Sequence, residues 1–297
     1  MNKKIMLSIL LTMLLCVTTG CAESKENSEK ESVILETDYT GSNSVNHEND
    51  IKECTEMVEL FGCKAEKIEA DITSQQLTEL YITAYNECKG RDCTPVIITL
   101  DDILQETIDA NYARQGTPED YRKAMLSTDT SNGKEHFETS FKQLEKQYED
   151  DTMGILSQSD EEFESLLSMS MPKNKCLGSV LAAQEQNNGT IYLIYVPTSN
   201  PWEVFAWLPF GGWNECPNTS ELLSQCRYWY EEYGAIPACI SHDMLEFYLF
   251  DPVADKEIAK KAAKEHCVFC NDILGMGGIN LEAVMIYNSN TWGFWWD

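Results

Sequence analysis

Basic residues are scarce in this chain of 297 residues. Lys and Arg together number 22 against 49 Asp and Glu, which gives a formal net charge of −27. No extended basic patch interrupts this acidity. Because an acidic surface repels phosphate backbones and anionic lipid headgroups, we exclude nucleic acid as a partner. The same charge favours solubility, cationic partners or divalent ions.

The sequence also lacks the motifs of common catalytic sites. It has no Gly-x-Ser-x-Gly, phosphate-binding loop, dinucleotide-binding glycine motif or His-Glu-x-x-His. His266, Cys267 and Cys270 lie close together, but no second pair of ligands stands at zinc-finger distance. We therefore expect no cofactor and no metal, and core packing is the favoured role of these two cysteines.

The first twenty residues predict a signal peptide over residues 1–20. Two lysines precede an apolar run, residues 5–17, which is shorter than the ~20 apolar residues of a membrane-spanning helix. Small residues then stand directly before Cys21, a pattern similar to the lipobox of bacterial lipoproteins. The resemblance implies that Cys21 receives a diacylglycerol thioether, with palmitate-type acyl chains that hold the protein at the cell membrane, facing outside the cytoplasm.

The next segment is rich in Glu, Ser, Lys, Asn and Asp and poor in apolar residues. Such a composition cannot bury enough surface to fold, so residues 21–50 are predicted to be the lipidated cysteine and a disordered tether. Twelve cysteines are present, and ten remain once Cys16 leaves with the signal peptide and Cys21 is lipidated. We single out Cys88 and Cys93 as a disulfide pair, because a glycine-containing connection joins a helix end to a strand there. Two separate buried thiols are the alternative.

Hydrophobic periodicity divides the remaining chain into three parts. Residues 51–110 are predicted to be an N-terminal α/β part, with a helix that ends near Gly90, a strand over residues 95–100 and a helix capped by Asp101 or Asp102. Residues 111–180 are acidic and amphipathic, which predicts a mainly helical insertion.

Residues 181–297 are predicted to form a C-terminal domain. The sequence indicates a strand over residues 191–196, a helix closed by Gly234, a hairpin around residues 242–244, helices capped by Asp255 and Asn280, and a final strand. Helices and strands mix without regular alternation. The expected fold class is therefore α+β, a small mixed sheet flanked by helices with a helical acidic insertion.

Long tryptophan-rich motifs in the last hundred residues carry a family resemblance. They are Val196–Pro217, Tyr228–Ala235, Ala263–Cys270 and Trp292–Asp297. In these stretches the chain resembles the bacterial domain of unknown function 4253 family. The upstream stretch Thr94–Glu106 resembles the N-terminal part of longer members of that family. The resemblance implies a shared domain but brings no activity, cofactor or catalytic residue with it.

Two aromatic groups are candidate ligand-binding surfaces. In the closing segment, alternation places Trp292, Phe294 and Trp296 on one face of a strand and Trp295 and Asp297 on the other. We expect this tail to be the last core strand, with Trp295 and Asp297 as an alternative pocket wall. The second group is a Pro- and Gly-containing loop that either lines a ligand cleft or packs as a lid over the core. Its candidate residues are Trp202, Trp207, Trp213, Asn214 and Glu215.

These features favour a membrane-anchored, non-catalytic lipoprotein module that binds an unknown protein or small-molecule ligand. One alternative is a cell-envelope hydrolase that uses Glu215 or Asp272 with His242 or His266. The acid–base candidates, none of them at a diagnostic spacing, are Glu203, Glu215, His242, Asp243, Glu265, His266 and Asp272. A further alternative, suggested by the acidity, is an immunity-type protein that neutralises a basic toxin.

Overall fold

The computed structural model describes residues 60–69, 71–149, 154–156 and 158–296. The expected signal peptide, the lipidation site Cys21 and the tether lie outside the described residues, as does Asp297. Within the described ranges, no helix is both long and apolar enough to cross a membrane.

Six strands in the described part of the chain form one mixed sheet in the order β1-β3-β2-β4-β5-β6. The parallel pair is β2 with β4, and the other neighbours are antiparallel. The strands are β1 (Lys64–Lys67), β2 (Thr94–Leu100), β3 (Thr190–Val196), β4 (Ile236–Ile240), β5 (Met244–Tyr248) and β6 (Thr291–Trp295). This sheet and its helices confirm the predicted α+β class.

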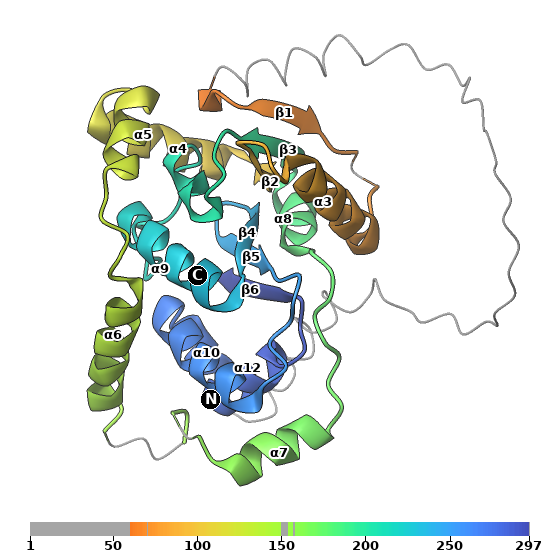
Figure 1. Cartoon of the computed structure of the whole chain (residues 1–297), viewed down its shortest axis with the longest axis vertical. Coiled ribbons are helices and arrows are strands. Elements are labelled where there is room, and N and C mark those ends of the chain that lie inside the picture. Colours follow the sequence, from red (N-terminus) through yellow and green to blue (C-terminus); the bar gives the residue numbers. More distant parts are fainter. Residues whose placement is uncertain (1–59, 70, 150–153, 157, 297) are drawn as a thin grey trace, which may run out of the picture.

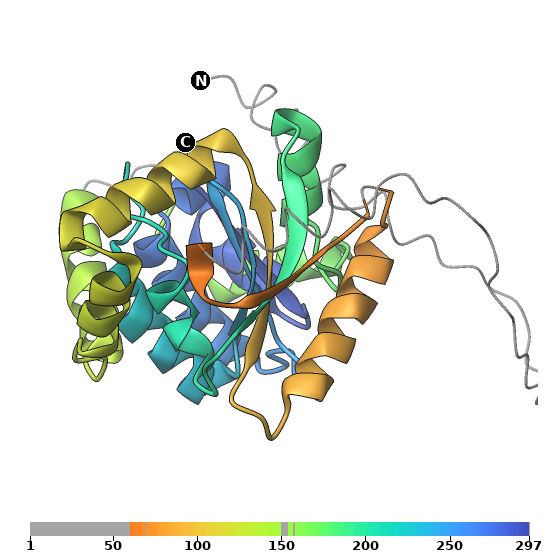
Figure 2. The ribbon, with the colours of Figure 1, turned by 90° about the horizontal axis from the view of Figure 1, so that it is seen from above.

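Helices cover both faces of the sheet (Figures 1 and 2). The helices of the described residues are α3 (Ser74–Cys88), α4 (Asp102–Gln115), α5 (Pro118–Leu126), α6 (Gly133–Gln147), α7 (Asp160–Ser168), α8 (Ser179–Asn187), the 3₁₀ helix η1 (Pro201–Ala206), α9 (Thr219–Tyr233), α10 (Lys256–Phe269), α11 (Asp272–Met276) and α12 (Gly278–Ile286). Helices α3 and α8 pack on one face against Ile97 and Leu193. Helices α9, α10 and α12 pack on the other face, where Val96 and Ile98 point. The alternating side chains of β2 thus serve two cores.

Helices fill much of the range predicted as an acidic insertion, residues 111–180. They are anchored by buried aromatic and aliphatic side chains, among them Tyr121, Phe137, Leu144 and Phe163, which join the core under α9 and α10. Phe137 stacks on Trp229 of α9, with ring centroids 5.1 Å apart. Apolar burial of this kind holds a helix in place where its exposed side is strongly charged.

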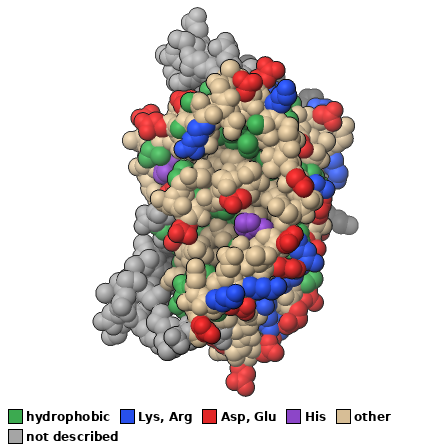
Figure 3. Space-filling view, turned by 90° about the vertical axis from the view of Figure 1, so that its left-hand side faces the viewer, with side chains coloured by type: hydrophobic (Ala, Val, Ile, Leu, Met, Phe, Trp, Pro, Cys, Tyr) green, Lys and Arg blue, Asp and Glu red, His purple; other side chains and the backbone are tan. Residues whose placement is uncertain are grey.

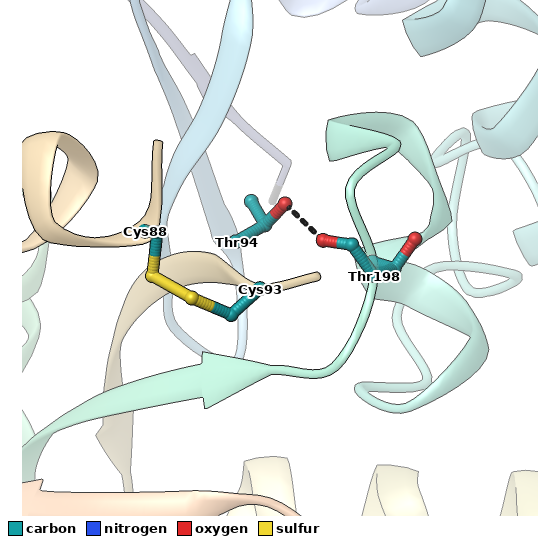
Figure 4. The surroundings of a disulfide bond; sticks show 4 residues. All are labelled: Cys88, Cys93, Thr94 and Thr198. Atoms are coloured by element: carbon teal, nitrogen blue, oxygen red, sulfur yellow. Dashed lines mark hydrogen bonds between the residues drawn. A yellow bond between two sulfur atoms is a disulfide. The ribbon is translucent and has the colours of Figure 1, made fainter. Parts of the chain in front are cut away.

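A disulfide joins Cys88, at the end of α3, to Cys93, one residue before β2 (Figure 4). The two Cα atoms are 5.3 Å apart. The next residue, Thr94, donates a hydrogen bond of 2.7 Å from Oγ1 to the carbonyl oxygen of Thr198, just past β3. These contacts fix the start of the central strand β2 on two sides.

The closing aromatic residues form the last core strand, as their alternation predicts. Trp292, Phe294 and Trp296 are each 2% exposed, and Gly293 is exposed on the opposite face. Trp292 and Phe294 contact Trp229 of α9 at centroid distances of 5.6 and 5.5 Å. The burial of three large aromatics contributes several kcal/mol at ~25 cal/mol per Å², so this chain end is held firmly in the fold.

Charged side chains of both signs are interspersed over the face of the molecule shown in Figure 3, with hydrophobic side chains in small, scattered patches. Several described Lys and Arg side chains stand beside acids, as in the pairs Arg227–Glu231 and Lys261–Glu232. Exposed pairs of this kind stabilise a fold by at most ~1 kcal/mol each. They mark ordinary solvated surface, so a ligand site must be sought in a concave region.

Candidate functional site

An apolar pocket of about 190 Å³ lies between α11, α12 and β6. A segment that precedes α8, residues 171–174, closes one side. The hydrophobic lining residues are Met171, Ile273, Met276, Leu281, Met285, Ile286 and Trp292. Among the lining residues in the described part of the chain, Glu282 is the one that carries a charge. Concave apolar surface with a few converging polar groups is the usual form of a small-molecule site.

The pocket owes its shape to the way α12 begins. Gly278 has φ +78°, and a Cβ atom there would lie 2.3 Å from the carbonyl oxygen of Ile155. That oxygen accepts the backbone hydrogen bond of Ile279 at 3.0 Å. Glycine is therefore required at this position for the close approach. The helix that follows then presents Leu281, Glu282 and Met285 to the pocket.

Glu282 contacts His266 of α10, which is buried in the core. The Nδ1 atom of His266 lies 2.7 Å from Oε1 of Glu282. The imidazole is buried, with its ring centroid 4.5 Å from that of Trp292 and 4.7 Å from that of Phe294. Burial lowers the pKa of His266, and the hydrogen bond to Glu282 opposes this only in part. A neutral imidazole that donates Nδ1–H to the carboxylate fits these surroundings.

The second histidine site lies at the turn between β4 and β5. Nδ1 of His242 is 2.7 Å from Oδ2 of Asp101, and Nε2 is 3.4 Å from Oδ2 of Asp243. Asp101 also caps α4, because its Oδ1 accepts the backbone N–H of Leu104 at 2.8 Å. The carboxyl ends of the parallel strands β2 and β4 meet here. The turn is thereby fastened to the start of α4.

Trp295, the last residue of β6, contacts this turn and is absent from the pocket lining. Its Nε1 donates a hydrogen bond of 2.8 Å to Oδ2 of Asp243, whose Oδ1 accepts one from Ser241 Oγ. The backbone carbonyl of Trp295 lies 3.1 Å from the Sγ of Cys270. Its predicted companion Asp297 lies outside the described residues, so a wall formed by both stays a prediction.

The three tryptophans of the loop contact three different places. Trp202 lies on Tyr230 of α9, at a centroid distance of 5.4 Å. Trp207 is buried beneath the guanidinium group of Arg122, 5.1 Å from its ring. Trp213 packs on Trp296 at 6.0 Å. The structure therefore does not bring these tryptophans together around one cavity.

The polar residues that follow the loop lie near the surface. Asn214 and Glu215 are exposed, and Oε2 of Glu215 accepts a hydrogen bond of 3.2 Å from Nδ2 of Asn271. Asn271 immediately precedes α11, which begins with Asp272. Among the described residues, the hydrogen bonds of His242 and His266 go to carboxylates other than Glu215 and Asp272. The expected hydrolase pairs are therefore not the pairs that form.

Two other acid–base candidates, Glu203 and Glu265, form hydrogen bonds that hold neighbouring segments together. Glu203 accepts hydrogen bonds from Thr198 Oγ1 and Asn200 Nδ2, which close the turn before η1. Glu265 is buried, and burial raises its pKa against the opposing effect of three donors. These donors are Tyr228 Oη, Trp229 Nε1 and Tyr233 Oη, at 2.9, 2.9 and 3.0 Å. This carboxyl joins α9 to α10 in the core.

Sequence reasoning missed Glu282 and assigned Asp101 a capping role alone. The available signal for Glu282 was local: it lies between Leu281 and Met285 on a short apolar helix. Nothing in that spacing shows that α10 lies alongside. In the described part of the chain, no group of three His, Cys, Asp or Glu side chains is arranged to hold a metal ion.

Comparison with known families gives a match for the C-terminal part of the chain. Residues 192–297 match the model of the family described as Domain of unknown function (DUF4253). The match begins inside β3 and contains β4 to β6, α9 to α12 and both His266 and Glu282. Neither the curated proteins nor the solved structures compared with the chain provide a match. Residues 192–297 thus form a region of the DUF4253 family, as the sequence motifs indicate.

Proposed function

We propose that this protein is a non-catalytic binding module that takes a small, largely apolar ligand into the pocket between α11, α12 and β6. The observation that supports this most strongly is the pocket lining, which combines hydrophobic side chains with one carboxylate, Glu282. A volume of about 190 Å³ suits a short single chain or a small ring. Apolar burial would provide the affinity, and the carboxylate would orient the ligand.

The side chains of the lining suit a ligand that is recognised mainly by shape. Met171, Met276 and Met285 contribute three thioethers to the pocket. Methionine is unbranched and polarizable, so it adapts to ligands of differing outline. The position of His266 favours binding over catalysis. Its Nε2 atom is buried and has no hydrogen-bond partner in the described part of the chain, whereas a histidine general base must reach its substrate.

Binding can be tested with octanol, a neutral probe, by calorimetry on the full-length protein. We expect the wild type to bind octanol and Met285→Trp to lose this binding, because the larger side chain fills the pocket. Met169→Trp is the matched control, since Met169 is 65% exposed. Equal binding by all three proteins, or no binding by the wild type, would contradict the proposal.

We further propose that a lipid on Cys21 holds this module at the cell membrane, outside the cytoplasm. The lipobox-like residues before Cys21 and the polar segment that follows support this. Cells that express the protein should incorporate radiolabelled palmitate into it, and Cys21→Ser should abolish the label. Unlabelled wild-type protein in the cytosolic fraction would contradict the anchor and leave the pocket proposal intact.

A further inference from the structure

Within the described residues, Glu282 forms no salt bridge with a lysine or an arginine. In the described part of the chain, its ionic contact is with His266. Burial lowers the pKa of that imidazole, so it supplies a hydrogen bond but not a full positive charge. The hydrogen bond with His266 is made at Oε1, and the side chain is 19% exposed where it lines the pocket. One side of this carboxylate is therefore available to a ligand.

Lys173 is the basic residue within residues 171–174, the segment that closes one side of the pocket. Lys173 donates a hydrogen bond of 2.7 Å from Nζ to the carbonyl oxygen of Val284. Its ammonium group also lies over the ring of Tyr287, 5.8 Å from the centroid. Both contacts hold Lys173 at the C-terminal turn of α12, and in the described part of the chain the ionic contact of Glu282 is with His266 and not with Lys173.

We infer that the ligand is a small cationic amphiphile, whose alkyl tail lies among the methionines and whose ammonium group pairs with Glu282. This inference rests on the proposed function, since it names the class of ligand for the same pocket. Apolar walls exclude water and so strengthen the attraction between a carboxylate and a cation. The ring of Trp292, which also lines the pocket, adds an aromatic surface that favours ammonium groups. The net charge of −27 draws cations toward the molecule.

The size of the pocket limits the source of the ammonium group. About 190 Å³ accommodates one short alkyl chain and not the two chains of a membrane phospholipid. A free alkylamine therefore fits better than a lipid headgroup with its diacylglycerol. The chemical class is a single-chain primary or methylated amine.

The test compares octylamine, octanol and octanoate, which share one alkyl chain and differ in the charge of the head. Calorimetry on the full-length protein at neutral pH should give the tightest binding for octylamine, ~10-fold tighter than for octanol and tighter still than for octanoate. Glu282→Gln should reduce octylamine affinity to that of octanol. Unchanged octanol binding by this variant would show that its pocket is intact.

Glu138→Gln is the matched control, because it removes one exposed carboxylate far along the chain on α6. It should keep the full preference for octylamine. Equal affinity of the wild type for octylamine and octanol would overturn the inference and leave the proposed binding function standing. If none of the three probes binds, both proposals fail. Equal loss of octylamine binding in both variants would attribute the preference to net charge and overturn the role of Glu282.

Discussion

Two histidine–carboxylate contacts in the described part of the chain have the same length and opposite burial. In both, Nδ1 lies 2.7 Å from a carboxylate oxygen. At the β4–β5 turn the histidine side chain is the more exposed partner, with His242 15% and Asp101 4% exposed. At the pocket the order reverses, with His266 1% and Glu282 19% exposed. The partner that can meet a ligand is an imidazole in one site and a carboxylate in the other.

This reversal distinguishes the turn, where the contact stabilises the fold, from the pocket, where the contact lies beside a site that is open to a ligand. At the turn, the outward nitrogen of His242 faces a second carboxylate, Asp243, which in turn holds Trp295. Every group there has a partner from the chain. At the pocket, the outward group is an oxygen of Glu282 beside apolar side chains. Distance alone would make the two sites equivalent, and burial shows that they are not.

The largest expected effect tests the difference in burial directly. Replacement of His266 by alanine should lower the free energy of unfolding by about 3 kcal/mol, because it leaves a cavity among Trp229, Trp292 and Phe294. His242→Ala should cost about 1 kcal/mol, since it removes hydrogen bonds at a partly exposed turn. Urea denaturation measures both. Equal losses would contradict the assignment of His266 to the core.

A decrease in pH should have an intermediate effect on the free energy of unfolding. Burial lowers the pKa of His266 in the folded state, whereas the unfolded chain has the ordinary value of about 6.5. The unfolded state therefore binds a proton first as the pH falls. The stabilisation is complete above pH ~6.5 and decreases below it, by at most ~1.4 kcal/mol per pH unit, until the folded-state pKa is reached.

The variant His266→Asn isolates this contribution, because its amide does not titrate. Glu246 and Glu265 also titrate, and burial raises the pKa of both, which changes stability in the opposite sense. These two groups are present in both proteins, so the difference between the two pH profiles reports His266. Urea denaturation between pH 7 and pH 5 should give the steeper fall for the wild type. Parallel profiles would show that the pKa of His266 is the same in the folded and the unfolded state, which would contradict the prediction.

Local elements were predictable where a single residue determines them. Gly234 ends α9 with φ +70°, as the position of a glycine after a helical run indicates. Asp255 caps α10 by accepting the N–H groups of Glu257 and Ile258. The prediction that Asn280 caps a helix was wrong, because α12 already begins at Gly278. Asn280 lies inside the helix.

That error shows why the pocket could not be predicted. The side chain of Asn280 donates a hydrogen bond of 2.7 Å to Glu162 of α7, a residue 118 positions away. The contact of His266 with Glu282 likewise depends on how α10 packs against α12. Periodicity shows which side of a helix is apolar and does not show which element covers it. The candidate site is a product of tertiary packing between helices whose separate patterns are ordinary.

The smallest expected effect concerns the two carboxylates. Here the loss of stability should be larger at the turn than at the pocket, which is the reverse of the order expected for the histidine variants. Asp101 needs two acceptor oxygens, one for the N–H of Leu104 and one for His242. Asp101→Asn keeps only one of them, so it should lower the free energy of unfolding by about 1 kcal/mol. Glu282 needs one acceptor for His266, which the amide oxygen of Glu282→Gln still supplies, so the change should stay within about 0.5 kcal/mol. Urea denaturation measures the loss of stability in both variants. A larger loss for Glu282→Gln than for Asp101→Asn would show that the carboxylate of Glu282 stabilises the fold and is not kept available for a ligand.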